Sequence, residues 1–392
     1  MLTRDEVIDS FKLVLKRDPE NDFTIEHFRN YEHVGPLLMD LVSSAEYDDV
    51  RRRRKAPNLT EYAFIDKGFE KAGIIANDIS YRDHPLFTMI LSNEHRVVDH
   101  LDSPVRLDIT LSEQLKDQGE NLAYKKLGQR RLGFLMQYLG PYISEFAQSN
   151  KFRLAFDFGD HGTPGFISMD RPSGADWPLM PDVYLFQASR EYIARLDLAD
   201  FLSDFKNRIP KLFWRGSTTG SSITSEHDLF RNYRVACCQT IANNAGASAD
   251  CKISRIAQVG EEFKDRYISA LSARGLFGDP VQEEVFTKYM MYVDMPGNTA
   301  GWGTCFKYLR GCLIFRPSQS RELAYSSLLR PWEHYIPLET DMSDAGERVA
   351  WVLENLDAAA TIAWRGHCLL HDFLSNMKQH LTEVFVAQNQ LN

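Results

Sequence analysis

Asp160 is the first residue of this chain that could do chemistry, because it lies directly beyond the alternating apolar run 152–158. A carboxylate beyond the end of a strand can act as a general base, and open α/β sheets bind their ligands at that edge. Aspartate beside glycine is also common in structural turns. Asp157 and His161 are the alternative candidates for the base.

A second group, Arg215-Gly216-Ser217-Thr218, follows Lys211-Leu212-Phe213-Trp214. Small residues let the backbone approach a ligand closely, and hydroxyls can donate hydrogen bonds to a phosphate. Arginine adds a fixed bidentate fork that suits the same ligand. The group therefore predicts a phosphate contact, with a structural arginine in a turn as the alternative.

A third group is the glycine-rich loop 296–303, which lies between a candidate strand at 290–293 and a short candidate helix at 306–309. Backbone amides in such a loop, together with the N-terminus of the next helix, favour a phosphate-bearing ligand. Trp302 in this loop could stack on a base or a sugar, or it could pack in the core.

The elements that must position these groups alternate between strands and helices over 150–344. This alternation predicts parallel sheets that carry ligands at the carboxyl ends of their strands. Further strands are expected at 85–91, 182–186 and 312–315, and helices over 124–146, over 226–243 and around residues 321–325. Helical patterns continue from residue 345 to the end.

The first fifty residues form a separate pattern. Thr3 and Glu6 can form a capping box, and apolar residues then recur at helical spacing, so we predict a helical module over 1–50. The basic run Arg51-Arg52-Arg53-Arg54-Lys55 follows. Such a run can contact anionic lipid, but a solvated linker is the more common interpretation. We place a domain boundary there.

Composition excludes several classes of protein. A length of 392 residues suggests two or three domains, and a net charge of −9 argues against nucleic acid as the main partner. The six cysteines show no Cys-x-x-Cys spacing, which predicts a reducing compartment without a zinc site or disulfide framework. No apolar leader or 18-residue apolar run is seen. We therefore expect a cytoplasmic protein, with peripheral membrane contact through the basic run as an option.

The order of residues over roughly 150–375 resembles the donor domain of glycosyltransferase family 90, the protein O-glucosyltransferases and capsule-associated xylosyltransferases. The upstream part of the resemblance is Phe213-Trp214-Arg215-Gly216-Ser217. The downstream part comprises Phe306 to Leu309, Glu322, Tyr325, Pro331, Trp332, His334, Tyr335, Asp341, Ser343 and Asp344. Eukaryotic relatives usually belong to the secretory pathway, so the expected cytoplasmic location suggests a bacterial-type member.

The resemblance implies an α/β, GT-B-like fold in which two Rossmann-like domains face a cleft, in addition to the N-terminal helical module. We expect an acceptor side at 56–208, a nucleotide-sugar donor side at 209–370 and a C-terminal helix at 371–392 that bridges back. The implied reaction is an inverting transfer of a glucose- or xylose-class sugar from a UDP-sugar to a hydroxyl acceptor. That acceptor would be a glycan, a lipid-linked glycan or a protein. The sequence contains no Asp-x-Asp site for a donor-bound metal among its candidate carboxylates, so no metal is expected.

The resemblance also implies roles for individual residues. Asp160 would be the general base, with His161 as an alternative base or a sugar contact. The donor contacts would be Arg215, Gly216, Ser217, Thr218, Asn298, Trp302, Lys307 and Glu322, the last on a helix and bound to ribose. Cys305 stands where family members commonly carry an arginine that reaches the diphosphate. A non-catalytic nucleotide-sugar- or glycan-binding protein, or a scaffolding protein, of the same fold is therefore the alternative function.

Overall fold

The computed structural model describes most of residues 2–44, Phe69, and 73–83, 87–94, 105–116, 122–191 and 195–391. The chain divides into two compact units, Met1–Glu61 and Tyr62–Asn392. The basic run at 51–55, and the linker predicted there, lie outside the described residues.

The first unit is helical, as predicted. The helix α1 (Arg4–Leu15) begins at the expected capping box: the Thr3 amide donates to Glu6 Oε2 at 2.7 Å, and the Glu6 amide donates to Thr3 Oγ1 at 3.2 Å. The Asn21 side chain caps α2 (Asp22–Phe28). The buried hydrophobic residues described in the unit are Leu2, Val7, Phe11, Leu15, Ile25, Leu37 and Leu41. This unit therefore has a hydrophobic core of its own.

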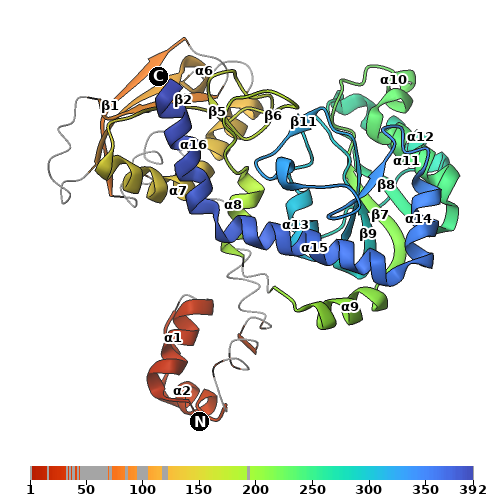
Figure 1. The fold of residues 1–392 in the computed structure, drawn as a ribbon, viewed down its shortest axis with the longest axis horizontal. Coiled ribbons are helices and arrows are strands. Elements are labelled where there is room, and N and C mark those ends of the chain that lie inside the picture. Colours follow the sequence, from red (N-terminus) through yellow and green to blue (C-terminus); the bar gives the residue numbers. More distant parts are fainter. Residues whose placement is uncertain are drawn as a thin grey trace. The chain divides into compact units, whose positions relative to one another are not determined.

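The second unit contains two five-stranded sheets (Figure 1). The first sheet consists of β1 (Ile74–Arg82), β2 (Thr88–Ser92), β3 (Val105–Ser112), β4 (Arg153–Asp157) and β5 (Ile167–Ser168). Their order is β1-β3-β2-β4-β5, and β2 runs antiparallel to both of its neighbours, so this sheet is mixed. The long helix α7 (Leu122–Ser149) packs against β3, as its apolar spacing predicts.

The second sheet is parallel throughout. It consists of β7 (Ile209–Ser217), β8 (Ala249–Arg255), β9 (Tyr289–Val293), β10 (Leu313–Pro317) and β12 (Ile336–Leu338), in the order β12-β10-β9-β7-β8. Strand β10, which lies between β12 and β9, is buried along its whole length. Covered parallel strands are apolar on both faces, which explains its apolar run Leu313-Ile314-Phe315. The unit is thus a mixed α/β fold with parallel pairing, as predicted.

Two connections join these sheets. Strand β6 (Arg171–Pro172), from the first half of the unit, pairs antiparallel with β11 (Arg321–Glu322), which follows β10. Helix α15 (Leu356–Ser375) packs against β10 and α13 (Thr304–Leu309), and α16 (Met377–Leu391) packs against β4 and α7 (Figure 1). The end of the chain therefore contacts both sheets.

Two predicted elements were wrong. Residues 182–186 form no strand, because the buried Asp182 caps helix α8 (Val183–Arg190) by accepting from the amides of Tyr184 and Leu185 at 2.8 and 3.2 Å. Residues 321–325 form no helix, because β11 pairs with a strand 150 positions earlier, which no local pattern shows. Pairing at this distance overrides local propensity.

The predicted helix over 226–243 is interrupted once. It consists of α10 (Glu226–Arg231) and α11 (Tyr233–Ala245). Asn232 separates them, and its side chain accepts from the Val235 amide at 3.4 Å. Asparagine is a strong N-cap, so it favours the start of a new helix at this position.

Candidate functional site

Asp160 follows β4 of the mixed sheet and lies close to the loop after β9 of the parallel sheet. Arg131, on α7, pairs with it at 2.6 Å between Nη2 and Oδ1. The other carboxylate oxygen, Oδ2, lies 3.5 Å from the side-chain nitrogen Nδ2 of Asn298, in the loop after β9. The Asp160 side chain is 24% exposed, so the candidate base keeps access to solvent. The structure thus brings two of the predicted site residues, Asp160 and Asn298, together.

Asn298 also joins three loops of the parallel sheet. Its Oδ1 accepts from the Gly220 amide, after β7, and from Gln258 Nε2, after β8, both at 3.0 Å. Gly220 has φ +120°, and a Cβ there would lie 3.4 Å from the Gly297 carbonyl oxygen. Only glycine adopts this conformation easily, so the loops after β7 and β9 can meet closely. Ligands of open α/β sheets bind at this edge.

Arg234, which no sequence pattern indicated, holds the same loops together. Its guanidinium donates to Thr219 Oγ1 at 2.7 Å and the Ser217 carbonyl at 3.2 Å, and to the carbonyls of Met295 and Pro296 at 2.9 and 3.0 Å. Burial lowers the pKa of this guanidinium. Arg234 lies on the inner face of α11, where an arginine inside a helical pattern gives no sign of these contacts.

Trp302, in the glycine-rich loop, is mostly buried, with 9% of its surface exposed. The Arg131 guanidinium carbon lies 4.9 Å from the centre of a Trp302 ring. Arg131 therefore contacts both Asp160 and the loop after β9. Most of the Trp302 surface is packed within the protein, which agrees with the packing role that the sequence allowed.

Asp170 is a second buried link that the sequence analysis missed. It is fully buried beyond β5, pairs with Arg321 and accepts from the Ala300 amide at 3.1 Å. Burial raises its pKa to about 6, although Arg321 opposes the shift. Arg321 also donates to the His161 carbonyl at 2.6 Å, next to Asp160, whereas the His161 side chain is exposed. This pair therefore fixes the Asp160 turn against the glycine-rich loop.

Two cations that were predicted to bind the diphosphate are committed to other partners. Arg215 Nη2 contacts both carboxylate oxygens of Asp250, at 2.9 and 2.8 Å. Lys307 is 6% exposed and pairs with Glu283 at 2.7 Å. Asp250 lies on the neighbouring strand β8, opposite Phe213, a register that the sequence does not reveal. The structure thus gives both cations partners within the protein, and their contact with a diphosphate stays a prediction.

The small residues after β7 are also engaged within the protein. Thr218 is buried, and its hydroxyl donates to the Ala257 carbonyl and accepts from the Ala257 amide, both at 2.9 Å. Gly216 makes room for Trp214, since a Cβ there would lie 2.4 Å from that ring. Ser217 is half-buried, with its hydroxyl 3.4 Å from Thr219 Oγ1. Of these three residues, Ser217 is therefore the best placed to reach a ligand.

Glu322 lies on β11 and not on a helix. Arg171, on the paired strand β6, donates to Glu322 Oε2 from Nη2 at 3.1 Å and from Nε at 3.2 Å. The Glu322 side chain remains 27% exposed. A carboxylate held in this way keeps its second oxygen available for another hydrogen bond.

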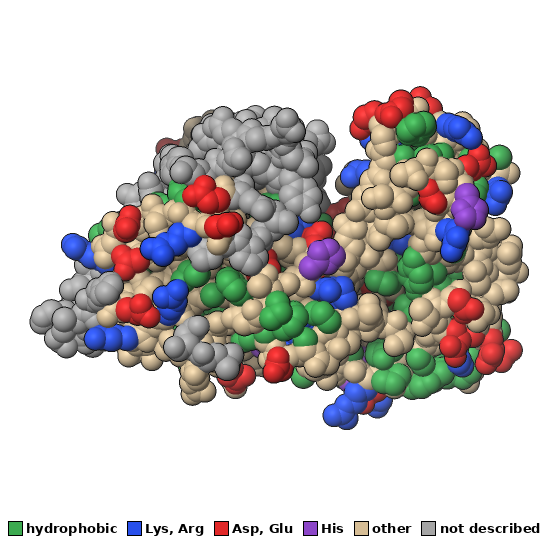
Figure 2. All heavy atoms as spheres, turned by 90° about the horizontal axis from the view of Figure 1, so that it is seen from above, with side chains coloured by type: hydrophobic (Ala, Val, Ile, Leu, Met, Phe, Trp, Pro, Cys, Tyr) green, Lys and Arg blue, Asp and Glu red, His purple; other side chains and the backbone are tan. Residues whose placement is uncertain are grey.

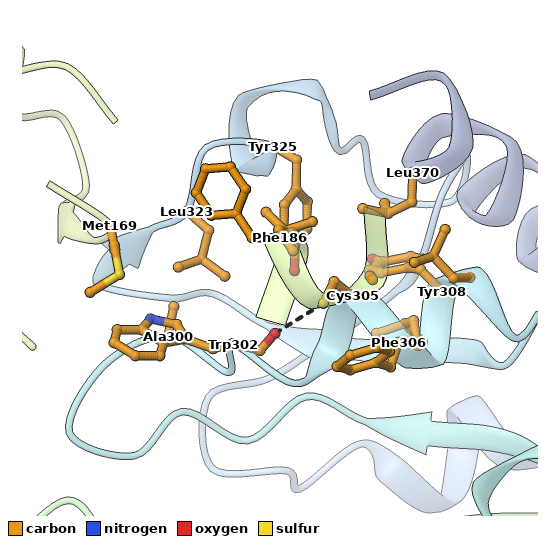
Figure 3. Packing of buried hydrophobic residues seen from close by; sticks show 14 of the residues in the cluster. Met169, Phe186, Ala300, Trp302, Cys305, Phe306, Tyr308, Leu323, Tyr325 and Leu370 are labelled. Atoms are coloured by element: carbon orange, nitrogen blue, oxygen red, sulfur yellow. Dashed lines mark hydrogen bonds between the residues drawn. The ribbon is translucent and has the colours of Figure 1, made fainter. Parts of the chain in front are cut away.

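Cys305 points into the core. It is fully buried, and its thiol donates to the Trp302 carbonyl at 3.3 Å, near Phe186, Tyr308 and Tyr325 (Figure 3). Burial raises the pKa of this thiol. At this position, where family members commonly carry an arginine that reaches the diphosphate, the backbone of α13 directs the side chain among apolar residues.

Charge on one face of the protein favours no single electrostatic target. Figure 2 shows acidic and basic side chains interspersed over the described part of one face. Across the described ranges, no three His, Cys, Asp or Glu side chains gather closely enough to hold a metal ion. Nor does any helix in those ranges combine the length and apolarity needed to cross a membrane.

Comparison with known proteins relates one segment of the chain to a family. The model of glycosyl transferase family 90 matches residues 192–381, which run from before α9 (Leu198–Asn207) into α16. Residues 192–381 belong to glycosyltransferase family 90. This family 90 segment contains Asn298, Trp302 and Glu322, whereas Asp160 and Arg131 precede it.

Curated relatives of this chain include protein O-glucosyltransferases. Human protein O-glucosyltransferase 3 is 30% identical over 89 residues, which cover 23% of this chain and 18% of the relative. Rat protein O-glucosyltransferase 1 is 30% identical over 122 residues, which cover 29% of this chain and 31% of the relative. The chain spans less than a third of the length of these two relatives.

Solved structures with a similar arrangement are distant. A trehalose-6-phosphate protein from E. coli bound with UDP-2-fluoro glucose is 10% identical, with a TM-score of 0.33, over 85% of this chain and 96% of that chain. The C-terminal domain of a group 1 glycosyl transferase (LpcC) from Francisella tularensis is 9% identical, with a TM-score of 0.30, over 47% of this chain and 96% of that chain. Likeness at this level carries no argument about the site.

Proposed function

We propose that this protein is a glycosyltransferase that transfers a sugar from a UDP-sugar to a hydroxyl acceptor, with inversion and with Asp160 as general base. The observation that carries the proposal is the approach of Asp160 to Asn298, which joins a carboxylate after β4 to the glycine-rich loop of the family 90 segment. The arrangement would be GT-B-like, with the donor on the parallel sheet and the acceptor on the mixed sheet.

In the proposed reaction, the acceptor oxygen bonds to the anomeric carbon while the bond from that carbon to the diphosphate breaks. The acceptor proton passes to Asp160, and the electron pair of the broken bond leaves with UDP. A positioned base of this kind contributes about 10²–10⁴-fold to the rate. A single displacement from the opposite face inverts the anomeric centre.

Donor binding would use the loops at the carboxyl ends of β7 and β9. The backbone of these two loops would approach the diphosphate, with the amides of Gly220 and Ala300 already donating to Asn298 and Asp170, and Ser217 would add a hydroxyl. Asn298 and Gly216 would shape the site by holding the loops and leaving space. Glu322 would accept hydrogen bonds from the ribose hydroxyls. Because Arg215 and Lys307 are paired elsewhere, we leave them out of the proposed diphosphate contacts. Metal independence stays a prediction.

The donor sugar would be glucose or xylose, and the names of the curated relatives favour glucose. A second function, binding of a nucleotide sugar without transfer, is favoured by one observation. Arg215 and Lys307, the cations expected to stabilise the departing diphosphate, pair with Asp250 and Glu283 instead.

The deciding experiment measures UDP release from UDP-glucose and UDP-xylose, and calorimetric binding of UDP, for the wild type and Asp160→Asn. We expect Asp160→Asn to bind UDP normally and to lose turnover. Asp176→Asn, an exposed aspartate in the same half, is the matched control and should behave as wild type. Binding without turnover in the wild type would favour the second function, and normal turnover in Asp160→Asn would exclude it as the base.

A further inference from the structure

We infer that Arg131 is a positioning residue that fixes the carboxylate of Asp160 and couples it to the donor loop through Trp302. The inference rests on the proposed function, in which Asp160 is the base. A guanidinium stays protonated in proteins, so Arg131 cannot itself take the acceptor proton. Its contribution must come through the groups that it holds.

Both arms of the Arg131 guanidinium contact the same turn. Nη2 pairs with Asp160 Oδ1 at 2.6 Å, and Nη1 donates to the Phe158 carbonyl at 3.2 Å. The guanidinium is planar and rigid, so anchoring one arm on the backbone fixes the direction of the other. Asp160 Oδ1 is therefore held, and Oδ2 is the oxygen directed towards Asn298.

Burial makes this pair stronger than a surface contact. The Arg131 side chain is 13% exposed, so solvent screens the pair less than it screens a pair on the surface. The neighbouring Arg130 lies on the same helix but is exposed. The position of Arg131 on α7 thus buries its side chain against Asp160, whereas the adjacent Arg130 faces solvent.

The face of the guanidinium contacts the donor side. Its carbon lies 4.9 Å from the Trp302 ring, within the range of a cation–π contact. Trp302 belongs to the loop that precedes α13, and its carbonyl accepts from the Cys305 thiol. Arg131 therefore contacts both the candidate base and the loop expected to hold the donor, so a shift of either one is transmitted to the other.

The test compares Arg131→Met, Arg131→Lys and the control Arg130→Met by UDP release and by calorimetric UDP binding. Misplacing a catalytic group by about 1 Å can cost about 10²-fold, so Arg131→Met should lower kcat by about 10- to 100-fold. UDP affinity should change far less, because the base does not bind UDP. Arg131→Lys, which keeps the charge but not the fork, should recover part of kcat. Arg130→Met should match the wild type.

A double-mutant comparison separates this inference from the proposed function. Arg131→Met should have no further effect on kcat in the Asp160→Asn background, because residues that act as one unit are not additive. In thermal unfolding, which requires no activity, the two substitutions should likewise shift the Tm non-additively. Full kcat in a folded Arg131→Met protein, or additive Tm changes, would overturn the inference. An inactive wild type, or a fully active Asp160→Asn, would instead count against the proposed function.

Discussion

Asp160 and Asn298 lie 138 positions apart in the chain, yet the side-chain nitrogen Nδ2 of Asn298 is 3.5 Å from Asp160 Oδ2. The contact joins the end of a strand in the mixed sheet to a loop of the parallel sheet. A neutral amide is suited to this position because it can face the carboxylate while its own oxygen accepts from Gly220 and Gln258.

A charge swap tests this contact. Asn298→Asp should lower the free energy of unfolding, because two carboxylates would face each other. Unit charges 4 Å apart interact by about 1 kcal/mol in water and about 4 kcal/mol near a protein surface. Asp160→Asn restores one donor and one acceptor but also removes the pair with Arg131, so the reference for the double variant is Asp160→Asn alone. In urea denaturation, Asn298→Asp should cost less stability in the Asp160→Asn background than in the wild type, while turnover stays lost. An equal cost in both backgrounds would show that the two side chains are not in contact.

Asp182 predicts a pH dependence of stability. Burial raises its pKa to about 7, and Oδ2 has no hydrogen-bond partner among the described residues. The folded state therefore binds a proton more readily than the unfolded state between about pH 4 and pH 7, so Asp182 makes the wild type less stable as the pH rises through this window. Asp182→Asn keeps the cap on α8 without the charge, and it should stabilise the protein at pH 8 more than at pH 5.

Thermal melts at the two pH values check this expectation. Asp182→Ala is the matched control, because it removes the charge and also the cap. It should lose about 0.5–2 kcal/mol relative to Asp182→Asn at both pH values. An equal effect of Asp182→Asn at pH 5 and pH 8 would contradict the assignment of the buried charge.

Cys305→Arg tests whether an arginine at this position can reach the donor. The wild-type side chain is buried in the core, so we expect the longer side chain to destabilise the protein. Overpacking of a core typically costs about 1–3 kcal/mol. Cys305→Ala, a matched small residue, should cost less, and neither variant should bind UDP more tightly in calorimetry. Tighter binding by a stable Cys305→Arg protein would show that the guanidinium escapes the core.

Arg234→Lys tests the link between the loops after β7 and β9. A lysine cannot reproduce the planar fork that contacts Thr219, Ser217, Met295 and Pro296, so UDP affinity and Tm should both fall. Each lost hydrogen bond typically costs about 0.5–1.5 kcal/mol. Arg231→Lys, on the exposed side of the preceding helix, should leave both quantities unchanged. Unchanged UDP affinity in Arg234→Lys would separate these loops from the donor site.

The parts of the site that the sequence predicted correctly depend on local patterns. Strands β4, β9 and β10 follow from short apolar runs, and the glycine-rich loop follows from its composition. Proximity of Asp160 to Asn298 was only implicit in their positions after strands. The partners of Arg215 and Lys307 come from other segments, and Arg131 and Arg234 occupy ordinary positions in helical patterns. Such pairings depend on tertiary register, which a single sequence does not contain.

The pairing of β6 with β11 joins the two sheets of this unit by backbone hydrogen bonds. The Ser173 amide donates to the Ser320 carbonyl at 2.8 Å, next to the Asp170–Arg321 pair and the Arg171–Glu322 pair. A hinge motion that separated the two sheets would have to break backbone hydrogen bonds as well as side-chain contacts. In the proposed function, the exchange of product for a new donor should then require local opening of the β6–β11 pairing. Amide hydrogen exchange at Ser173 should report each opening directly.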